Sequence, residues 1–385
     1  MLPKLLFITS RFPYPLEKGD KLRAFYFIKE LSKTHNVVLI SLSDKKVHLS
    51  EKQKLEEICA KVYCFELKKW NIAFNLFLGL FSNKPFQVHY FYSFSRYLKI
   101  NKIIKEEKPD HIFCQLIRVS EYVKNYHNCT KTIDYMDALS KGIERRKAIV
   151  PISTKWLFKM EHNRLLNYES LIFDYFDSKL IISKQDRKCI MHPQKESIKV
   201  IPNGIDASFF MENNVNPEFD LVFVGNLSYA PNIDAVEYIL TKILAVTNFT
   251  CLISGANPSK YLSKKIMNVK NATLWADVED IKASYCAAKI FIAPLFIGTG
   301  LQNKLLEAMA LGLPCITTRL VNNSLGAKEE KQIQIADTSD EFIFKIETLL
   351  KNENQREKIS TEAKEFIRNN YSWSKAVDLF LSKED

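Results

Sequence analysis

The strongest constraint on the fold is an alternation of apolar runs with helical patterns along all 385 residues. Each run is short and apolar enough to be a buried strand, and the segments between the runs have helical periodicity. Near-continuous apolar strands that alternate with helices are typical of parallel sheets covered on both faces. We therefore predict strands over residues 4–10, 36–42, 62–67, 111–117, 131–136, 179–183 and 198–201, and over 221–225, 250–255, 272–275, 289–294, 314–318 and 332–336.

The chain is too long for one ordinary domain, and its strands form two groups. The stretch Ile201–Asp206 and the polar residues that follow it separate the groups, and Leu221 begins a new first strand. We predict an α/β protein of two Rossmann-like, doubly wound domains, residues 1–200 and 201–370. Residues 371–385 form a short amphipathic helix. In sheets of this kind ligands bind beyond the carboxyl ends of the strands.

The segment Ile292–Pro314 carries the clearest chemical signal. It reads as a buried strand, a loop with Gly298 and Gly300, and a helix that stops at Gly312. Backbone N–H groups at such a helix start favour a phosphate or pyrophosphate, and Glu307 one turn further on could accept hydrogen bonds from a ribose diol. The alternative is a surface helix whose charges are merely solvated. The spacing of the residues alone does not distinguish a ligand-binding helix from such a surface helix.

The sequence GTGLQNKLLEAMALGLP resembles the E-x7-E segment of family 4 nucleotide-sugar glycosyltransferases. Within that family it resembles a bacterial subgroup linked to exopolysaccharide gene clusters. The resemblance implies a GT-B arrangement, in which two such domains face each other across a cleft. The first domain would then bind the acceptor, the second the nucleotide sugar, and the terminal helix would cross back to the first. Glu307 matches the second motif glutamate, which binds the donor ribose. Thr299 stands where the first, sugar-contacting glutamate is expected, and this departure puts the sugar's identity in doubt.

Other donor contacts follow from the same resemblance. Many family members have an Arg and a Lys after the glycine at Gly225, where this chain has Asn226 and Ser228. Charge on the leaving diphosphate would then be stabilised by Lys304 and nearby backbone amides, although Lys304 could also be an ordinary solvated helix charge. The predicted donor residues of the second domain are Gly225, Asn226, Ser254, Gly255, Val278, Thr299, Gly300, Leu301, Gln302, Asn303 and Glu307. The loops at Ser254 and Val278 could instead be plain turns.

In the first domain, a long loop after the first strand precedes a helix with Gly19, Lys21 and Arg23 near its start. This combination favours an anion, and in the resembled enzymes the loop lies under the donor diphosphate. The alternative is a surface loop with ordinary basic residues.

A later strand of this domain ends in two carboxylates. We expect Asp134 inside that strand and Asp137 on the loop after it, with Asp137 as the first catalytic candidate and Asp134 as the second. A helix cap is the alternative for Asp137. Arg118 is a candidate for binding the acceptor or a phosphate.

Charge is distributed unevenly between the halves. Residues 1–200 carry 36 Lys and Arg against 21 Asp and Glu, a balance of +15, whereas residues 201–385 carry 19 against 23, a balance of −4. A basic first half suggests an anionic partner such as a membrane surface or a lipid pyrophosphate. Nucleic acid is not predicted as a partner, because no known nucleic-acid motif accompanies the charge.

The aromatic stretch Trp70–Phe81, with basic residues beyond it, resembles an interfacial anchor or a groove for a lipid-linked acceptor, with helix packing in the core as the alternative. No run of 18 apolar residues and no signal peptide is recognised, so we expect a cytoplasmic protein, with peripheral attachment to the inner membrane face as an option. The eight scattered cysteines fit buried, reduced thiols and neither a metal site nor a disulfide framework.

The sequence therefore predicts a hexosyl-type glycosyltransferase of polysaccharide synthesis, acting on a glycan or lipid-linked acceptor. Its donor is a nucleotide sugar, UDP favoured slightly over GDP. Retention of anomeric configuration is implied by the resemblance alone. No metal site is expected, since no Asp-x-Asp motif is suitably placed, and no cofactor beyond the donor substrate. Two alternatives remain open: a non-catalytic or degenerate sugar-nucleotide-binding protein, and an epimerase or phosphorylase of the same fold.

Overall fold

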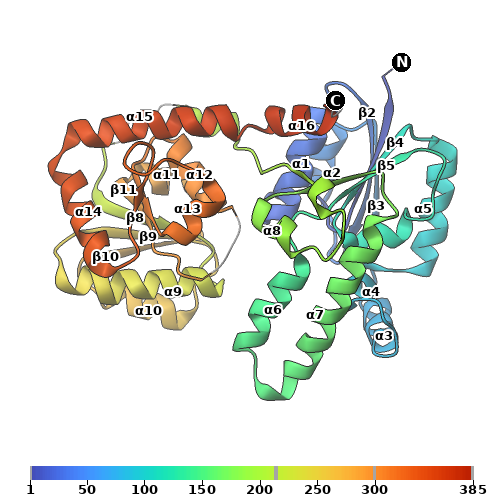
Figure 1. Ribbon diagram of the computed structural model, residues 1–385, viewed down its shortest axis with the longest axis horizontal. Helices are drawn as coiled ribbons and strands as arrows, with labels where there is room; N and C mark the ends of the chain where they lie inside the picture. The colour runs from blue at the N-terminus through green and yellow to red at the C-terminus, as the bar shows by residue number, and fades with distance from the viewer. Residues whose placement is uncertain (1, 212–215, 298–300, 383–385) are drawn as a thin grey trace. The chain divides into compact units, whose positions relative to one another are not determined.

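The computed structural model describes residues 2–211, 216–297 and 301–382, with the backbone alone at residues 148 and 149. By their contacts they form two units. Unit 1 holds residues 2–202 with 377–382, and unit 2 holds residues 203–376. Each unit is a parallel sheet with helices on both faces (Figure 1), which confirms the predicted class of two Rossmann-like domains. The ranges 1–200, 201–370 and 371–385, with the roles assigned to them, stay predictions.

Unit 1 contains a seven-stranded sheet in the order β3-β2-β1-β4-β5-β6-β7. Its order reverses between β1 and β4, a reversal that marks the ligand site in sheets of this class. The strands are β1 (Lys4–Thr9), β2 (Asn36–Ser43), β3 (Lys61–Glu66), β4 (His111–Gln115), β5 (Thr130–Asp134), β6 (Ser178–Ile181) and β7 (Lys199–Val200). The helices are α1 (Gly19–Leu31), α2 (Leu49–Glu56), α3 (Lys69–Gly79), α4 (Phe86–Phe91), α5 (Phe94–Glu107), α6 (Leu139–Ile149), α7 (Ile152–Phe173) and α8 (Lys184–Cys189), with short 3-10 turns η1 (Ile117–Tyr122) and η2 (Lys195–Ser197).

Unit 2 contains a six-stranded sheet in the order β10-β9-β8-β11-β12-β13, which reverses between β8 and β11. Its strands are β8 (Phe219–Val224), β9 (Cys251–Gly255), β10 (Ala272–Ala276), β11 (Ala288–Ala293), β12 (Cys315–Thr317) and β13 (Gln334–Ile335). Its helices are α9 (Ala230–Tyr238), α10 (Lys260–Met267), α11 (Ile281–Cys286), α12 (Asn303–Ala310), α13 (Arg319–Leu325), α14 (Ser339–Lys351) and α15 (Glu353–Asn370), with short turns η3 (Ala207–Phe210), η4 (Ile239–Ile243) and η5 (Leu244–Val246).

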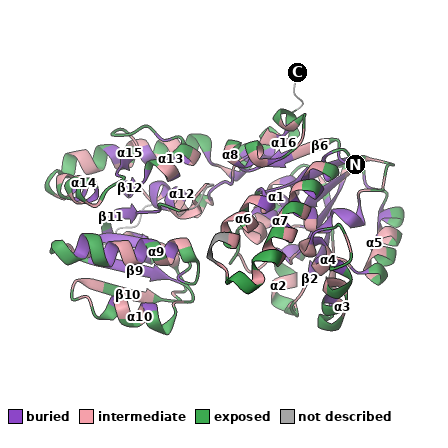
Figure 2. Cartoon of the chain, turned by 60° about the horizontal axis from the view of Figure 1, so that its bottom comes forward, coloured by how far each residue is buried: buried purple, intermediate pink, exposed green. Residues whose placement is uncertain are grey.

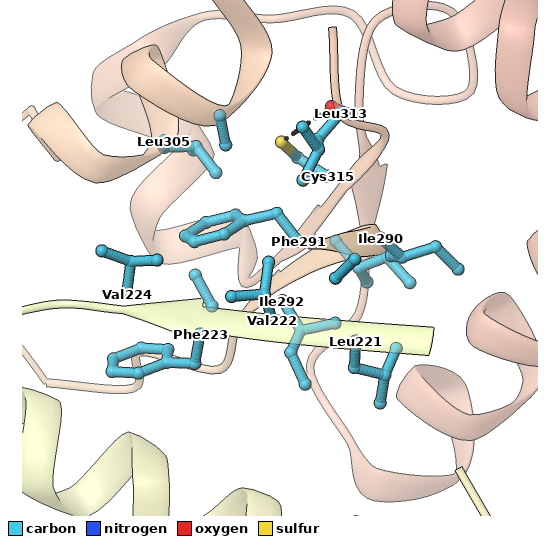
Figure 3. Packing of buried hydrophobic residues seen from close by; sticks show 14 of the residues in the cluster. Leu221, Val222, Phe223, Val224, Ile290, Phe291, Ile292, Leu305, Leu313 and Cys315 are labelled. Atoms are coloured by element: carbon cyan, nitrogen blue, oxygen red, sulfur yellow. Dashed lines mark hydrogen bonds between the residues drawn. The ribbon is translucent and has the colours of Figure 1, made fainter. Parts of the chain in front are cut away.

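Burial of the strands explains their apolar composition. Each unit has its own cluster of buried side chains, and the strands are mostly buried while the outer faces of the helices are exposed (Figure 2). Phe223 of β8, Phe291 of β11 and Leu305 of α12 belong to the core of unit 2 and are each at most 1% exposed. Figure 3 shows these two strands packed with Leu305, which fixes the orientation of α12 on the sheet.

Every predicted strand range overlaps a strand of the structure, with ends that shift by at most two residues. Strand β5 ends at Asp134, because Met136 takes a left-handed conformation with φ 58° that turns the chain. Helix α12 begins at Asn303, after the predicted loop, and Gly312 with φ 85° follows its end. All eight cysteines are free thiols, and Cys59, Cys114, Cys251 and Cys315 are buried while the other four are partly buried.

The carboxyl-terminal helix α16 (Trp373–Leu381) ends among residues of unit 1. There the ring of Phe380 lies 5.3 Å from that of Phe113 in β4, and the backbone carbonyl of Ser382 accepts a hydrogen bond from Lys199. In the described parts of the chain, no helix combines the length and the apolar character that crossing a bilayer requires.

We predict that Gly255→Ala destabilises unit 2 by about 3 kcal/mol or more. A Cβ at Gly255 would lie 1.7 Å from the carbonyl oxygen of Gly225, so two backbone segments would have to separate. The matched control is Gly142→Ala in α6, where a Cβ meets nothing within 4 Å and the loss of a helical glycine is expected to stabilise by about 0.5–1 kcal/mol. Urea unfolding with limited proteolysis measures both, and wild-type stability of Gly255→Ala would contradict the prediction.

Candidate active site

In unit 2, the candidate site is built on two glycines at the carboxyl ends of neighbouring strands. The N–H of Gly225 donates to the carbonyl of Ser254 at 3.0 Å, and Gly255 touches the backbone of Gly225. The N–H of Asp277, after β10, donates to the carbonyl of Gly255 at 3.1 Å. Three successive loops are therefore tied together at the edge of the sheet where ligands bind in this class of fold.

Lys304 projects from the first turn of α12 toward Gly225. Its ammonium donates a hydrogen bond to Oδ1 of Asn232 and lies 5.1 Å from the ring centre of Phe223. A Cβ at Gly225 would be only 3.1 Å from Nζ, so the glycine leaves room for the lysine. Burial lowers the pKa of Lys304 to about 8, against the opposing influence of Glu307. Lys304 is thus no ordinary solvated helix charge.

Glu307 lies one turn further along α12. Its Oε2 accepts a hydrogen bond of 2.7 Å from the hydroxyl of Tyr285, a side chain with no exposed surface. Desolvation raises the pKa of Glu307, and the Tyr285 hydroxyl and Lys304 counteract that rise. The tyrosine orients one carboxylate oxygen of Glu307, and the carboxylate keeps a second oxygen for a ligand.

Asn232 and Tyr285 are site residues that the sequence analysis missed. Asn232 is 4% exposed. Its amide nitrogen donates a hydrogen bond to the carbonyl of Asn226 at 2.8 Å, and its amide oxygen accepts one from the ammonium of Lys304. The run Ala-Pro-Asn after β8 gave a weak signal, since it marks a helix start. Tyr285 gave none, because nothing local in the sequence relates it to Glu307.

The other predicted donor residues of unit 2 differ in their exposure and in their hydrogen bonds. The Ser254 side chain is a correction: its hydroxyl is fully buried and paired with that of Ser284 at 2.7 Å, so it offers a ligand no side-chain contact. Asn226 is exposed, and its Oδ1 accepts from the amide and hydroxyl of Ser228 at 2.9 and 2.7 Å. Val278 is partly exposed after β10.

Around the start of α12, Leu301, Gln302 and Asn303 are partly exposed, and Gln302 is the N-cap residue that precedes the helix. Leu301 packs against the core of unit 2, which turns its side chain inward. Thr299 and Gly300 lie outside the described residues, so the predictions on them stay as they were.

In unit 1, Arg23 and Asp134 form a fully buried ion pair, and this corrects two predictions. Arg23 donates through Nε to Oδ2 of Asp134 at 2.6 Å and through Nη1 to the carbonyl of Ile201 at 3.0 Å. Both side chains have at most 1% of their surface exposed, so neither contacts a ligand in this conformation. Asp134 also accepts from the N–H of Met136 at 3.2 Å, which stabilises the turn leading to Asp137.

Asp137 lies on that turn with an exposed side chain. Ala138 is the N-cap residue of α6, so Asp137 is not a helix cap, and its side chain has no hydrogen bond to any described residue. Although Asp137 keeps a solvent-exposed part, the protein around its carboxyl group partly desolvates it and, with the nearby charge of Asp186, raises its pKa to about 6. A carboxylate that titrates near neutrality at the end of a strand is a candidate for proton transfer.

Arg118 belongs to a compact cluster beside the β1 and β4 ends. Asp20 pairs with Arg11 at 2.7 Å and lies 3.9 Å from Arg118, whose guanidinium also donates to Gln87 at 2.6 and 2.9 Å. Burial and Arg11 lower the pKa of Arg118 to about 10. The buried Nε of Arg11 has no hydrogen-bond partner among the described residues, so the cluster retains capacity for an anion.

The Gly19 loop differs from its predicted role in one respect. Gly19 begins α1, is exposed, and has nothing within 4 Å of a Cβ position, so no close backbone approach requires a glycine there. Lys21 is partly buried, its Nζ lies 3.4 Å from the carbonyl of Tyr14, and burial lowers its pKa. Among the described residues no group of three or more His, Cys, Asp or Glu side chains could hold a metal ion.

Two hollows of unit 1 lie at the opposite edge of its sheet. One is lined by residues such as His127, Lys131 and Asp177, and the other by residues such as Lys4 and Asn36. These residues stand at or near the amino ends of strands, where this class of fold does not bind its ligands. We therefore keep the candidate site at the carboxyl edges.

Comparison with known proteins agrees with this geometry. Residues 218–352 match the family described as glycosyl transferases group 1. An uncharacterized 44.6 kDa protein in the cps region of Klebsiella pneumoniae is 28% identical over 416 residues, covering 100% of both chains.

Two solved structures share the fold. A glycosyltransferase from Rickettsia africae aligns with a TM-score of 0.67 at 14% identity, covering 99% of this chain and 97% of its own. Anabaena Alr3699/HepE, in complex with UDP and glucose, aligns with a TM-score of 0.69 at 14% identity, covering 98% of both.

The two sheets and the site on α12 define a GT-B protein. With a group 1 glycosyl transferase domain over residues 218–352 and the relative in the cps region, the chain is similar to family 4 glycosyltransferases. The group 1 domain extends from β8 to α14 and includes α12, the helix that carries Lys304 and Glu307.

We predict that replacing one member of the Arg23–Asp134 pair lowers the free energy of unfolding more than replacing both members does. Arg23→Met or Asp134→Asn alone leaves a buried charge without its partner and lowers the free energy of unfolding by about 3–5 kcal/mol. The double variant Arg23→Met/Asp134→Leu leaves no such charge, and we expect a loss smaller than that of either single variant. Urea unfolding of the three proteins measures the coupling, and additive losses would contradict it.

Proposed function

We propose that this glycosyltransferase moves a hexose from a nucleoside diphosphate sugar to a hydroxyl group of a glycan or lipid-linked acceptor in cell-surface polysaccharide synthesis. A UDP-sugar is the favoured donor over a GDP-sugar, and the anomeric configuration is retained without a metal ion. The relative in the cps region supports the polysaccharide context, and the Anabaena structure with UDP and glucose supports the donor class.

The observation that carries the proposal is the pairing of Lys304 and Glu307 on successive turns of α12. The carboxylate of Glu307, oriented by Tyr285, accepts the two ribose hydroxyls. One turn nearer the helix start, the ammonium of Lys304 and the backbone N–H groups at the start of α12 receive the diphosphate. Asn226 and Val278 lie on the loops that would border the nucleotide.

Departure of the nucleoside diphosphate places negative charge on its phosphate oxygens. Lys304 and the helix amides stabilise that charge more in the transition state than in the bound donor, which lowers the barrier to breaking the sugar–phosphate bond. Lys304 is partly buried, and low hydration strengthens its interaction with an anion. The identity of the sugar depends on the neighbourhood of Thr299.

Unit 1 supplies the acceptor side of the reaction. Asp137, with a pKa raised to about 6, accepts the proton of the acceptor hydroxyl, and it is held there by the turn that Asp134 and Arg23 stabilise. Arg118, Arg11 and Lys21 form the basic surroundings for a phosphate of the acceptor or donor. Arg23 and Asp134 are therefore positioning residues, whereas Asp137 contacts substrate.

We predict that Glu307→Ala raises the Kd for UDP by roughly 10- to 100-fold, because hydrogen bonds from the ribose to a charged acceptor are lost. With 2′,3′-dideoxy-UDP, which lacks those hydroxyls, the variant and the wild type should bind alike. Isothermal titration calorimetry measures both ligands.

The matched control is Glu365→Ala on α15, an exposed glutamate with no ion pair to a described residue. Tyr285→Phe tests the orienting hydroxyl and should weaken UDP binding by less than Glu307→Ala does. An unchanged UDP affinity in Glu307→Ala would show that the ribose binds elsewhere. Binding of UDP and UDP-sugars by the wild type, without transfer to any hydroxyl acceptor, would favour a degenerate binding protein.

We predict a pH dependence of UDP binding that follows Lys304. Its pKa of about 8 means that the ammonium is charged below that pH and mostly neutral above it. Since the charged form attracts the diphosphate, the affinity should be greatest at neutral pH and fall roughly tenfold between pH 7 and pH 9. Lys304→Met should bind UDP weakly with no such fall, whereas the exposed Lys264→Met should keep the wild-type profile. A wild-type affinity that is constant across this range would contradict the assignment.

A further inference from the structure

The outward face of α3 is apolar, the reverse of an ordinary surface helix. Trp70, Phe74 and Phe77 follow one another at intervals of four and three residues in α3, which places them on one side, and Phe81 lies two residues after the helix ends. Their exposed fractions are 65%, 56%, 58% and 81%. Leu78 at 45% extends the same surface. We call these five side chains the aromatic face.

The opposite side of α3 is firmly attached to unit 1. Ile72 is 9% exposed, Asn75 donates to the carbonyl of Tyr92, and Gly79 packs closely against Phe86 and His89 of α4. Arg164 of α7 donates to the carbonyl of Gly79 at 2.7 Å. Because these contacts fix the helix by its other side, the aromatic face is presented outward by the folded protein.

Basic residues surround this face, and acidic residues are absent from the sequence around it. Residues 67–105 contain seven Lys and Arg and no Asp or Glu. Lys68 and Lys69, at the start of α3, are exposed and form no ion pair with a described residue. In the same stretch, Phe94 and Leu98 of α5 are 65% and 55% exposed.

The α6–α7 hairpin also combines exposed apolar side chains with basic residues. Near its tip, Ile152 and Trp156 are 85% and 58% exposed. The hairpin carries basic residues at Lys141, Arg145, Arg146, Lys147, Lys155 and Lys159, and Glu144 is the sole acidic residue between 141 and 160. In Figure 1 the hairpin and α3 project beyond the same edge of unit 1, and Arg164 connects α7 to the end of α3.

We propose that the aromatic face and the tip of the α6–α7 hairpin dock onto an anionic phospholipid bilayer. Exposed tryptophan and phenylalanine enter the boundary between headgroups and acyl chains, and lysine and arginine around them attract anionic headgroups. Charge complementarity selects lipid over a second copy of the chain, since the sequence around this surface has a large excess of basic over acidic residues and two such surfaces would repel each other. The docking requires no sugar transfer, so it does not depend on the proposed function.

Helix α4 links the aromatic face to Arg118, near the carboxyl ends of β1 and β4. Helix α4 packs on α3 and carries Gln87, which accepts two hydrogen bonds from Arg118, and Phe91, whose ring lies 5.6 Å from the Arg118 guanidinium. If the proposed function holds, a lipid-linked acceptor leaving the bilayer would meet Arg118 first.

Vesicle flotation tests the docking. We expect the protein to float with vesicles of equal phosphatidylglycerol and phosphatidylcholine, and at least about tenfold less with phosphatidylcholine alone, with binding that weakens as salt rises. The triple variant Trp70→Ser/Phe74→Ser/Phe77→Ser should lose binding at least about tenfold, because each aromatic ring buries roughly 150 Å² or more. Lys68→Gln/Lys69→Gln should bind less and depend less on salt.

Matched controls come from unit 2. Phe344→Ser removes an aromatic side chain that is 66% exposed on α14, and Lys264→Gln/Lys270→Gln removes two exposed lysines that form no ion pair with a described residue. Both should float like the wild type. Trp70 supplies a direct readout, since its fluorescence should shift to the blue on adding anionic vesicles and Trp70→Phe should lose that part of the shift.

Three results would overturn the proposal. These are no flotation with anionic vesicles, equal flotation of the triple variant, or light scattering that shows a dimer which the triple variant abolishes. The last would make a second copy of the chain the occupant of the face. UDP binding is measured on the same preparations, so that loss of vesicle binding with intact UDP binding, or the reverse, separates this proposal from the proposed function.

Discussion

Parallel strand pairing determines where chemistry can occur in this protein. Every strand pair of the described residues is parallel, so each crossover returns the chain through a helix and the loops after the strands gather at one edge of each sheet. In unit 2 that constraint brings the β8, β9 and β10 ends into backbone contact through Gly225, Gly255 and Asp277. Helix α12 starts at the same edge, and its first two turns supply the ammonium and the carboxylate of the site.

The sequence predicts those features that depend on local periodicity. Buried strands and amphipathic helices repeat at fixed intervals, so the thirteen strands and α12 could be predicted within a few residues. Lys304 and Glu307 share the polar side of one helix, which made both recognisable. Asn232 and Tyr285 were not, because the hydrogen bonds that join them to Lys304 and Glu307 span 72 and 22 residues, and such pairings exist only in the folded chain.

Errors in unit 1 have the same origin. Lys21 and Arg23 are two positions apart in α1 and therefore project on opposite sides, but sequence alone does not say which side meets the sheet. Arg23 faces inward, where its charge requires a partner, and Asp134 supplies it from the end of β5. The pairing removes both residues from contact with ligands, while the turn that follows leaves Asp137 exposed. A basic residue near a predicted phosphate site can thus serve to neutralise a buried acid.

The partner of each cation decides whether its charge is available to a substrate. Arg11 pairs with Asp20, and Arg23 with Asp134, so much of each positive charge is balanced within the protein. Lys304 donates instead to the neutral amide of Asn232, which orients the ammonium without neutralising it. This distinction matters because Asn226 and Ser228 stand where related transferases are expected to have an Arg and a Lys. A single oriented and unneutralised lysine beside the backbone amides at the start of α12 can then provide much of the attraction for a diphosphate that two further cations would otherwise share.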